Sequence, residues 1–269
     1  MSARVRLRID LAYDGGPFAG FARQPDQDTV QGTLEQACTR LLGQPVTTTG
    51  AGRTDRGVHA LAQVCHLDVD VAVARARRAV ADVEALRRRL DALTGPAITV
   101  WRVRPVPEAF DARFSATERR YRYRLIDHEV APPLARHDHW VVGVPLSVPA
   151  MRAAARPLVG EHDFASFCRK RPGATTVRRL TAVTLHRPGP GRVDVRVAGT
   201  AFCHQQVRAI VGCLVEVGRG ARPPGWVAEV LAARDRNAAG AVAPPEGLTL
   251  ERVSYGRRWP AAPPRDVIT

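Results

Sequence analysis

Hydrophobic and polar residues alternate along several stretches of the chain, with the period of two that is typical of half-buried strands. The clearest stretch is residues 4–13, where Val5, Leu7, Ile9 and Leu11 share one face and charged residues occupy the other. Stretches of the same kind predict further strands over residues 61–71, 98–106, 119–126, 177–186, 192–198 and 248–255. The sequence Pro-Gly-Pro-Gly at residues 188–191 predicts a hairpin between two of these strands.

Other stretches repeat apolar residues at the spacing of one helix face. The first such stretch begins after Thr29, a predicted N-cap, and is stopped by Gly43. The expected helices span residues 30–42, 72–93, 147–159, 204–217 and 226–233. Strands and helices in this order predict an α+β protein with antiparallel or mixed sheets.

The sequence Pro-Val-Pro at residues 105–107 is the expected boundary between two related α/β halves. We expect an N-terminal domain over residues 1–106 and a C-terminal domain over residues 107–259. Residues 260–269 are rich in Pro and Ala, which predicts a frayed tail.

The chain is strongly basic, with 40 basic and 26 acidic residues and a net charge of +14. Lys170 is the only lysine, and a G+C-rich coding bias would explain this preference for arginine. The bias does not cancel the positive field, so a polyanion such as RNA is the partner that the charge favours.

The five cysteines, an odd number, show no C-x-x-C spacing, which argues against a disulfide framework and a structural zinc site. We therefore expect buried, reduced thiols. The eight histidines also lack the spacing of a metal site, so no metal or organic cofactor is expected. Because the first residues lack a signal-peptide core and no apolar run reaches about 18 residues, we expect a soluble, cytoplasmic protein without a membrane segment.

A short polar loop at residues 50–60 contains the most distinctive residues of the chain. Asp55 lies between Arg53 and Arg56, in a segment with several glycines. Nearby cations favour the ionised form of a carboxyl group, which suits a nucleophile. The alternative is an ordinary turn, in which the Asp bonds its own backbone and the arginines are solvated.

Two further segments combine charge with aromatic or apolar residues. Arginines and aromatics interleave over residues 113–123, a pattern suited to stacking a nucleobase, although Tyr121 and Tyr123 share a strand face that equally fits a protein core. Arg208 begins an apolar helix, where a buried guanidinium needs a partner and a solvent-facing one does not.

Residues 52–60, Gly-Arg-Thr-Asp-Arg-Gly-Val-His-Ala, resemble the catalytic motif of the tRNA pseudouridine synthase A family. Four further motifs of that family are resembled by residues 13–24, 112–123, 202–212 and 246–250. All five motifs follow one another along this chain in the order that the family has. Two positions depart from the family pattern, because Gln206 replaces a methionine and Phe21 replaces a tryptophan. The resemblance extends from about Tyr13 to Tyr255.

The resemblance implies a role for each matching residue. Asp55 is the expected nucleophile, Arg208 its salt-bridge partner, and Tyr121 the residue that packs on the target uracil. The same resemblance implies substrate contacts by Arg53, which holds the flipped nucleotide, by Leu248, which lines the uracil pocket, and by Arg23 and Gln24, which face the RNA.

The resemblance also implies the overall design and the reaction. We expect the two halves to join into one extended sheet, with helices on one side and an active cleft between the halves. The expected enzyme is a homodimer that isomerises uridine to pseudouridine in the tRNA anticodon stem–loop, at tRNA positions 38, 39 and 40. Attack of the carboxylate on C6 of the base or on C1′ of the ribose is left open.

Two other classes of function compete with this prediction. One is a basic RNA-binding protein without catalysis, which would bind tRNA and form no pseudouridine. The other is a thiol- or metal-dependent enzyme on the same fold, which a thiol blocker or a chelator would inactivate.

Overall fold

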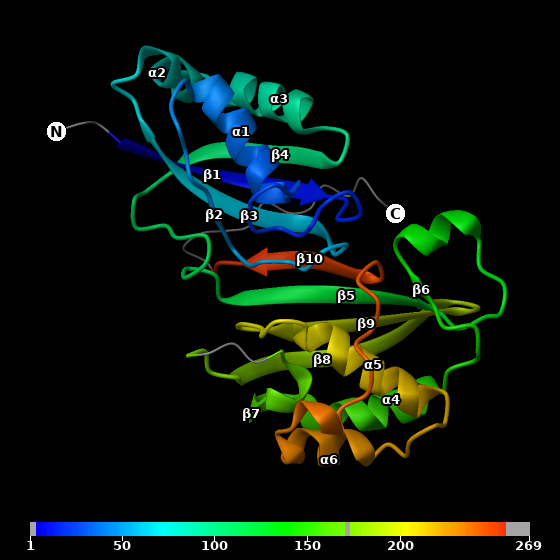
Figure 1. Ribbon diagram of the computed structural model, residues 1–269. Coiled ribbons are helices and arrows are strands. Elements are labelled where there is room, and N and C mark those ends of the chain that lie inside the picture. The colour runs from blue at the N-terminus through cyan, green and yellow to red at the C-terminus, as the bar shows by residue number, and fades with distance from the viewer. Residues whose placement is uncertain (1–3, 170–172, 257–269) are drawn as a thin grey trace. The chain divides into compact units, whose positions relative to one another are not determined.

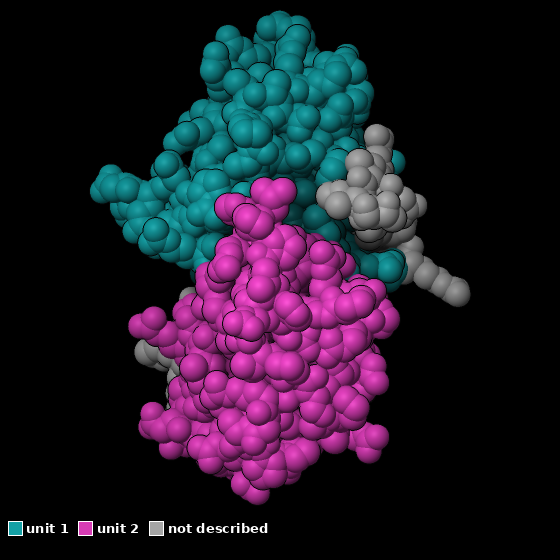
Figure 2. Space-filling model, turned by 90° about the vertical axis from the view of Figure 1, so that its right-hand side faces the viewer, with its two compact units in different colours: residues 1–117, 250–269 teal, residues 118–249 magenta. Residues whose placement is uncertain are grey.

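The computed structural model describes residues 4–169 and 173–256. These residues form two compact units (Figure 2). Unit 1 contains residues 1–117 and 250–269, and unit 2 contains residues 118–249.

An antiparallel sheet forms the centre of unit 1 (Figure 1). Its strand β1, Arg4–Tyr13, pairs with β3, His59–Asp70, on one side and with β4, Ile98–Val106, on the other. The short strand β2, Thr49–Gly50, extends this sheet beside β3. Strand β10, Leu248–Ser254, also lies next to β3 and enters unit 1 at Leu250.

Three helices pack with this sheet: α1, Val30–Leu42, α2, Ala74–Ala81, and α3, Val83–Thr94 (Figure 1). Helix α1 begins and ends as predicted, because the Thr29 hydroxyl accepts a hydrogen bond from the Gly32 amide and Gly43 has a φ of 71°. The prediction of a single helix over residues 72–93 was wrong. The helix is interrupted at Asp82. The side chain of this residue accepts a hydrogen bond from the Ala85 amide and so caps the start of a second helix.

The second half of the polar face of β1 is buried, at Arg8 and Asp10, which the alternating pattern did not predict. Arg8 is 0% exposed, and its guanidinium donates to the Asp10 carboxylate at 2.9 and 2.6 Å. The same guanidinium lies 5.4 Å from the ring centre of Phe110 and 4.8 Å from that of Tyr255. A charge can be buried when it is paired and stacked in this way, so the expected half-buried strand is buried on both faces.

Unit 2 contains a second antiparallel series of strands, in the order β5, β9, β8 and β7. Their bounds are Glu118–Ile126, Arg192–Gly199, Val177–Gly189 and Gly160–Asp163. Strand β6, Trp140–Val141, runs parallel to β5. The hairpin between β8 and β9 is confirmed, whereas β6 and β7 had no clear sequence pattern.

The helices of unit 2 are α4, Val148–Ala155, α5, Gln206–Gly218, and α6, Trp226–Ala233. Helix α4 is shorter than expected because the chain continues as a 3₁₀ turn that contains Pro157. Further 3₁₀ turns span Pro133–His137, Ala165–Phe167 and Arg236–Ala238. None of the helices within the described ranges is both long and apolar enough to cross a bilayer.

Both units combine sheets with helices, so the expected α+β class is confirmed. The units differ from the predicted domains because residues 107–117 and most of the last strand belong to unit 1. Hydrogen bonds explain this difference, since the Tyr255 hydroxyl donates to the Ala112 carbonyl at 2.7 Å and the Thr117 amide donates to the Ser254 carbonyl at 2.8 Å. The tail predicted at residues 260–269 lies outside the described residues.

Candidate active site

The loop that carries Asp55 is fixed to the sheet of unit 1 through the residue before it. The buried Thr54 hydroxyl lies 2.8 Å from the Tyr13 hydroxyl at the end of β1. The Thr54 carbonyl accepts a hydrogen bond from the Phe21 amide at 3.1 Å. Immediately afterwards the Val58 amide donates to the Asp55 carbonyl, and Gly57 takes a φ of 77°, so Asp55 begins a tight turn.

A second loop, residues 14–29, packs against this turn so closely that glycine is required. A Cβ at Gly15 would lie 2.1 Å from the Val58 carbonyl oxygen. A Cβ at Gly20 would meet the Thr54 carbonyl at 3.2 Å, and Gly20 also has a φ of 124°. The glycines at the start of the chain therefore let the two loops form one rigid support for Asp55.

Gln63 is a supporting residue that the sequence analysis missed. It lies on β3, is fully buried, and its amide nitrogen donates to the Gly52 carbonyl at 2.8 Å and to the Tyr13 hydroxyl at 3.3 Å. One side chain thus ties the beginning of the Asp55 loop to β1. The available signal was a glutamine inside a stretch read as an apolar strand, because such a residue needs buried hydrogen-bond partners.

Asp55 itself is half-buried, and both flanking arginines are exposed. Asp55 is therefore accessible in part to solvent, and the two arginines next to it in sequence are open to solvent. Cations this close in sequence add positive potential around the carboxylate. The position fits a reactive acid that a polyanionic ligand can approach.

Arg23 and Gln24 lie at the exposed end of the second loop. The Arg23 side chain is 73% exposed, and its guanidinium lies 3.6 Å from the buried Glu35 carboxylate. Glu35 also accepts hydrogen bonds from the Thr48 amide at 2.8 Å and from Gln31 at 3.0 Å. The Gln24 amide nitrogen donates to the Ala19 carbonyl at 3.3 Å. Both predicted RNA-facing residues are thus open to solvent and attached to a fixed backbone.

Tyr121 is buried on β5 of unit 2, where it faces Val197 of β9. Its ring meets the ring of Phe202 edge-on, with centroids 5.1 Å apart and an interplanar angle of 84°. Such T-shaped pairs are a preferred aromatic arrangement. Phe202 belongs to the segment that leads into α5, so this contact joins two of the sequence motifs.

Arg208 lies on the first turns of α5 and is half-buried. Its Nε donates to the Ala243 carbonyl at 2.7 Å, and the Ala243 amide donates to the Arg208 carbonyl at 3.2 Å. The segment before β10 is thereby held against the helix. Burial and the charge of Glu246 raise the pKa of Tyr123, and Arg208 acts in the opposite direction, so its cation reaches this part of unit 2.

Gln206, which departs from the family pattern, has a structural role at the start of α5. Its side-chain carbonyl accepts a hydrogen bond from the Cys203 amide at 2.8 Å, and it is almost fully buried. Four cysteines are buried free thiols, as expected, whereas Cys203 is only half-buried. A hydrogen bond with Cys168 lowers the pKa of Cys203 to about 7.

Leu248 is buried at the start of β10, and its amide donates to the Pro245 carbonyl at 2.9 Å. The preceding Gly247 is packed tightly, because a Cβ there would lie 2.6 Å from the Tyr123 ring. Its carbonyl accepts a hydrogen bond from the Arg124 amide at 2.9 Å. The Glu-Gly-Leu motif is therefore fixed beside β5.

The predicted site residues thus fall into two groups, each organised within one unit. Unit 1 holds Asp55, Arg53, Arg23 and Gln24 on two interlocked loops, and unit 2 holds Tyr121, Arg208 and Leu248 around β5 and α5. Within residues 4–169 and 173–256, no group of three or more His, Cys, Asp or Glu side chains is placed to hold a metal ion. The reactive group that unit 1 offers is the carboxylate of Asp55, on a loop whose backbone is held by hydrogen bonds.

Comparison with known proteins gives a consistent result. The family model described as tRNA pseudouridine synthase matches residues 11–115 and 154–256. A tRNA pseudouridine synthase A from Frankia casuarinae is 51% identical over 253 residues, which cover 93% of this chain and 89% of the relative. Relatives of the same name from Leifsonia xyli subsp. xyli and Ralstonia nicotianae are 46% and 42% identical, and the alignments cover 93% and 96% of this chain and 92% and 94% of the relatives.

Proposed function

The chain belongs to the tRNA pseudouridine synthase family, as its motifs predicted, and from this premise we propose that it isomerises specific uridines of tRNA with Asp55 as the nucleophile. An enzyme of this family is an isomerase that converts tRNA uridine to pseudouridine. The proposed targets are uridines of the anticodon stem–loop, at tRNA positions 38, 39 and 40.

The assignment of Asp55 as the nucleophile rests on one observation, which is that hydrogen bonds and close packing hold the backbone of its loop. Thr54, immediately before it, is bonded through its hydroxyl to Tyr13 and through its carbonyl to Phe21, and the turn after it leaves no room for a side chain at Gly15. A catalytic group needs a fixed position to reach its target atom, and a residue that is only half-buried stays within reach of a substrate.

The reaction requires a group that can add covalently and leave again, which a carboxylate does. The bond between N1 and C1′ breaks, the uracil rotates, and a bond forms between C5 and C1′. C5 then loses its proton and N1 gains one, so the product is an isomer and no redox cofactor is consumed. Addition of Asp55 at C6 or at C1′ satisfies this balance equally.

The other site residues take complementary roles in the proposal. The target base leaves its stack at a cost of a few kcal/mol, and Arg53, exposed beside the nucleophile, is suited to hold the extruded nucleotide. Tyr121 packs on the uracil and Leu248 lines its pocket. Arg208 is the proposed salt-bridge partner of Asp55, and the exposed Arg23 and Gln24 contact the RNA.

We further propose a homodimer that acts in the cytoplasm. The dimer is proposed from the family to which the chain belongs. The cytoplasmic location is proposed from the tRNA substrate and from the five free thiols, which suit a reducing compartment. Sedimentation analysis of the purified protein tests the dimer, and a single species with the mass of one chain would contradict it.

The function is tested by incubating the protein with unmodified tRNA and mapping pseudouridine at each position. We expect pseudouridine at positions 38, 39 or 40, in the presence of a chelator and a thiol blocker. Binding of tRNA without any pseudouridine would instead favour an RNA-binding protein without catalysis. Loss of activity with either reagent would favour the thiol- or metal-dependent class.

A further inference from the structure

Phe114 of unit 1 is an aromatic side chain that the proposed chemistry does not use. Its side chain is 81% exposed, although a phenyl ring gains more from burial than most side chains. Among the described residues of unit 1, the other exposed large apolar side chain is Leu93 on α3, at 38%. Phe114 is therefore the one exposed aromatic ring among the described residues of unit 1.

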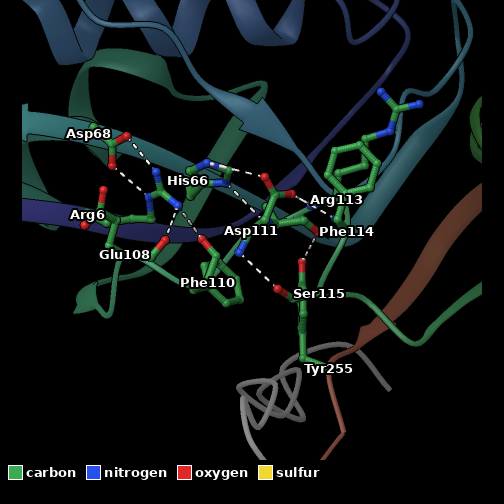
Figure 3. Close-up of polar contacts among 11 residues, drawn as sticks. Arg6, His66, Asp68, Glu108, Phe110, Asp111, Arg113, Phe114, Ser115 and Tyr255 are labelled. Atoms are coloured by element: carbon green, nitrogen blue, oxygen red, sulfur yellow. Dashed lines mark hydrogen bonds and ion pairs between the residues drawn. The ribbon is translucent and has the colours of Figure 1, made fainter.

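The backbone around Phe114 is held by its own side chains (Figure 3). The Asp111 carboxylate accepts hydrogen bonds from the Arg113 amide at 2.7 Å and from the Phe114 amide at 2.8 Å. The Ser115 hydroxyl accepts one from the Asp111 amide at 3.0 Å, and the Ser115 amide donates to the Asp111 carbonyl at the same distance. These four bonds define a compact turn over residues 111–115.

The base of this turn is anchored to the sheet. His66 of β3 accepts a hydrogen bond from the Ala112 amide at 3.0 Å, and the Tyr255 hydroxyl donates to the Ala112 carbonyl at 2.7 Å. Arg6 of β1 donates to the carbonyls of Glu108 and Phe110 (Figure 3). Because the backbone of the turn is already held, stacking of a ligand on Phe114 would cost little conformational entropy of the protein backbone.

The guanidinium of Arg113 brings positive charge to the turn. The Arg113 guanidinium lies over the Phe114 ring, 5.4 Å from its centre. The nearby carboxylates are already engaged, since Asp68 is bonded to Arg6 through both oxygens at 2.7 Å and Asp111 accepts from two amides. The turn thus presents one aromatic face and one cation, the combination that proteins use to stack an unpaired nucleobase beside its phosphate.

We propose that Phe114 and Arg113 form a stacking platform for an unpaired base of the tRNA substrate, outside the set of residues that act on the target uridine. The inference rests on the proposed function, because it names a contact that the same substrate makes. A partner protein is the less suitable occupant, since stable protein interfaces bury about 800 Å² per side around an apolar centre, and the described residues of unit 1 offer no other exposed large apolar side chain than Leu93.

The experiment measures the dissociation constant for unmodified tRNA with four variants of the full chain. Phe114→Ala and Phe114→Leu remove the aromatic face, and Phe114→Trp keeps it. Leu134→Ala is the matched control, because Leu134 is equally exposed at 82% and belongs to the other unit. Melting temperatures of all variants confirm folding, and sedimentation reports their oligomeric state.

Loss of stacking weakens binding by about 5- to 100-fold for one base, so we expect that increase for Phe114→Ala and Phe114→Leu. Phe114→Trp and Leu134→Ala are expected within about 2-fold of the wild type, since one keeps the stacking face and the other removes none. An unchanged dissociation constant for Phe114→Ala would overturn the proposal. Weaker binding accompanied by a change in oligomeric state would overturn it as well. Pseudouridine formation by the wild-type chain is measured in parallel, so failure of the proposed function is seen separately.

Discussion

At the residue scale, the neighbours of the proposed nucleophile hold the backbone of its loop in place. Thr54 supplies both a hydroxyl and a carbonyl that attach the loop, and these two hydrogen bonds do not involve the Asp55 carboxylate. Replacement of that carboxylate is therefore expected to change the chemistry more than the fold.

His66 provides a prediction on pH at the same scale. Burial lowers the pKa of His66, Arg6 lowers it further, and Asp111 and Asp68 oppose the shift. In the folded state the ring is thus harder to protonate than in the unfolded chain, where its pKa is about 6.5. The contribution to stability is full above that value and is lost as the pH falls towards the folded-state pKa.

We expect the free energy of unfolding to fall between about pH 7 and about pH 5, and to fall less in His66→Gln, which has no titrating ring. Urea unfolding at both pH values measures this difference, and the groups common to both proteins cancel. Equal pH dependence in the two proteins would show that His66 does not contribute to it.

At the element scale, unit 1 depends on the close contact between the loop at residues 14–29 and the Asp55 turn. A Cβ at Gly15 would lie 2.1 Å from the Val58 carbonyl oxygen, whereas a Cβ at Gly16 would approach the exposed carboxylate of Asp14, at 3.2 Å. Adjacent glycines therefore differ sharply in what a methyl group would disturb.

Gly15→Ala is expected to displace the Asp55 turn and to lower the single-turnover rate of pseudouridine formation by about 100-fold, because catalytic groups tolerate little misplacement. Gly16→Ala is the control and is expected to stay within about 2-fold of the wild type, since the exposed Asp14 carboxylate needs to move by only a few tenths of an ångström. Both rates are measured with saturating enzyme on the same tRNA. Comparable rates for the two variants would mean that the contact at Gly15 does not position the turn.

The elements also show where sequence patterns succeed and fail. Alternation predicted the bounds of β1 and the hairpin of β8 and β9, because both depend on local periodicity and turn residues. The same alternation misplaced Arg8, whose burial depends on the distant Phe110 and Tyr255. Helical periodicity continues through Asp82 and could not reveal that this residue ends one helix and caps the next.

The candidate site shows the same division between local and distant information. The Asp55 loop was found from its motif, and its glycines were understood as turn formers. The close approaches of Gly15 to Val58 and of Gly20 to Thr54 join this loop to a segment about 40 residues away, so they become visible only in the structure. Gln63 was missed for the same reason, since its partners lie on two other segments.

At the scale of the whole molecule, the excess of arginine is the property that most directly concerns the substrate. The chain carries a net charge of +14, and the arginines beside Asp55 and on the turn at Phe114 are exposed. Binding of tRNA neutralises phosphates and releases their counterions, so affinity depends on salt.

We expect the dissociation constant for tRNA to rise by at least about 10-fold between about 50 and 200 mM salt, with a linear plot of log affinity against log salt concentration. Filter binding with unmodified tRNA over this range measures the slope. A flat profile would contradict an RNA ligand held through its phosphates.

The central claim is that the Asp55 carboxylate is the nucleophile, and its most direct test is the release of tritium from tRNA labelled at C5 of uridine, since that hydrogen leaves when C5 bonds to C1′. Asp55→Asn keeps the size of the side chain and removes its charge. The predicted result is no release above background from this variant, with tRNA affinity within about 3-fold of the wild type because the loop is held by its neighbours. Release at a rate close to that of the wild type would contradict the assignment.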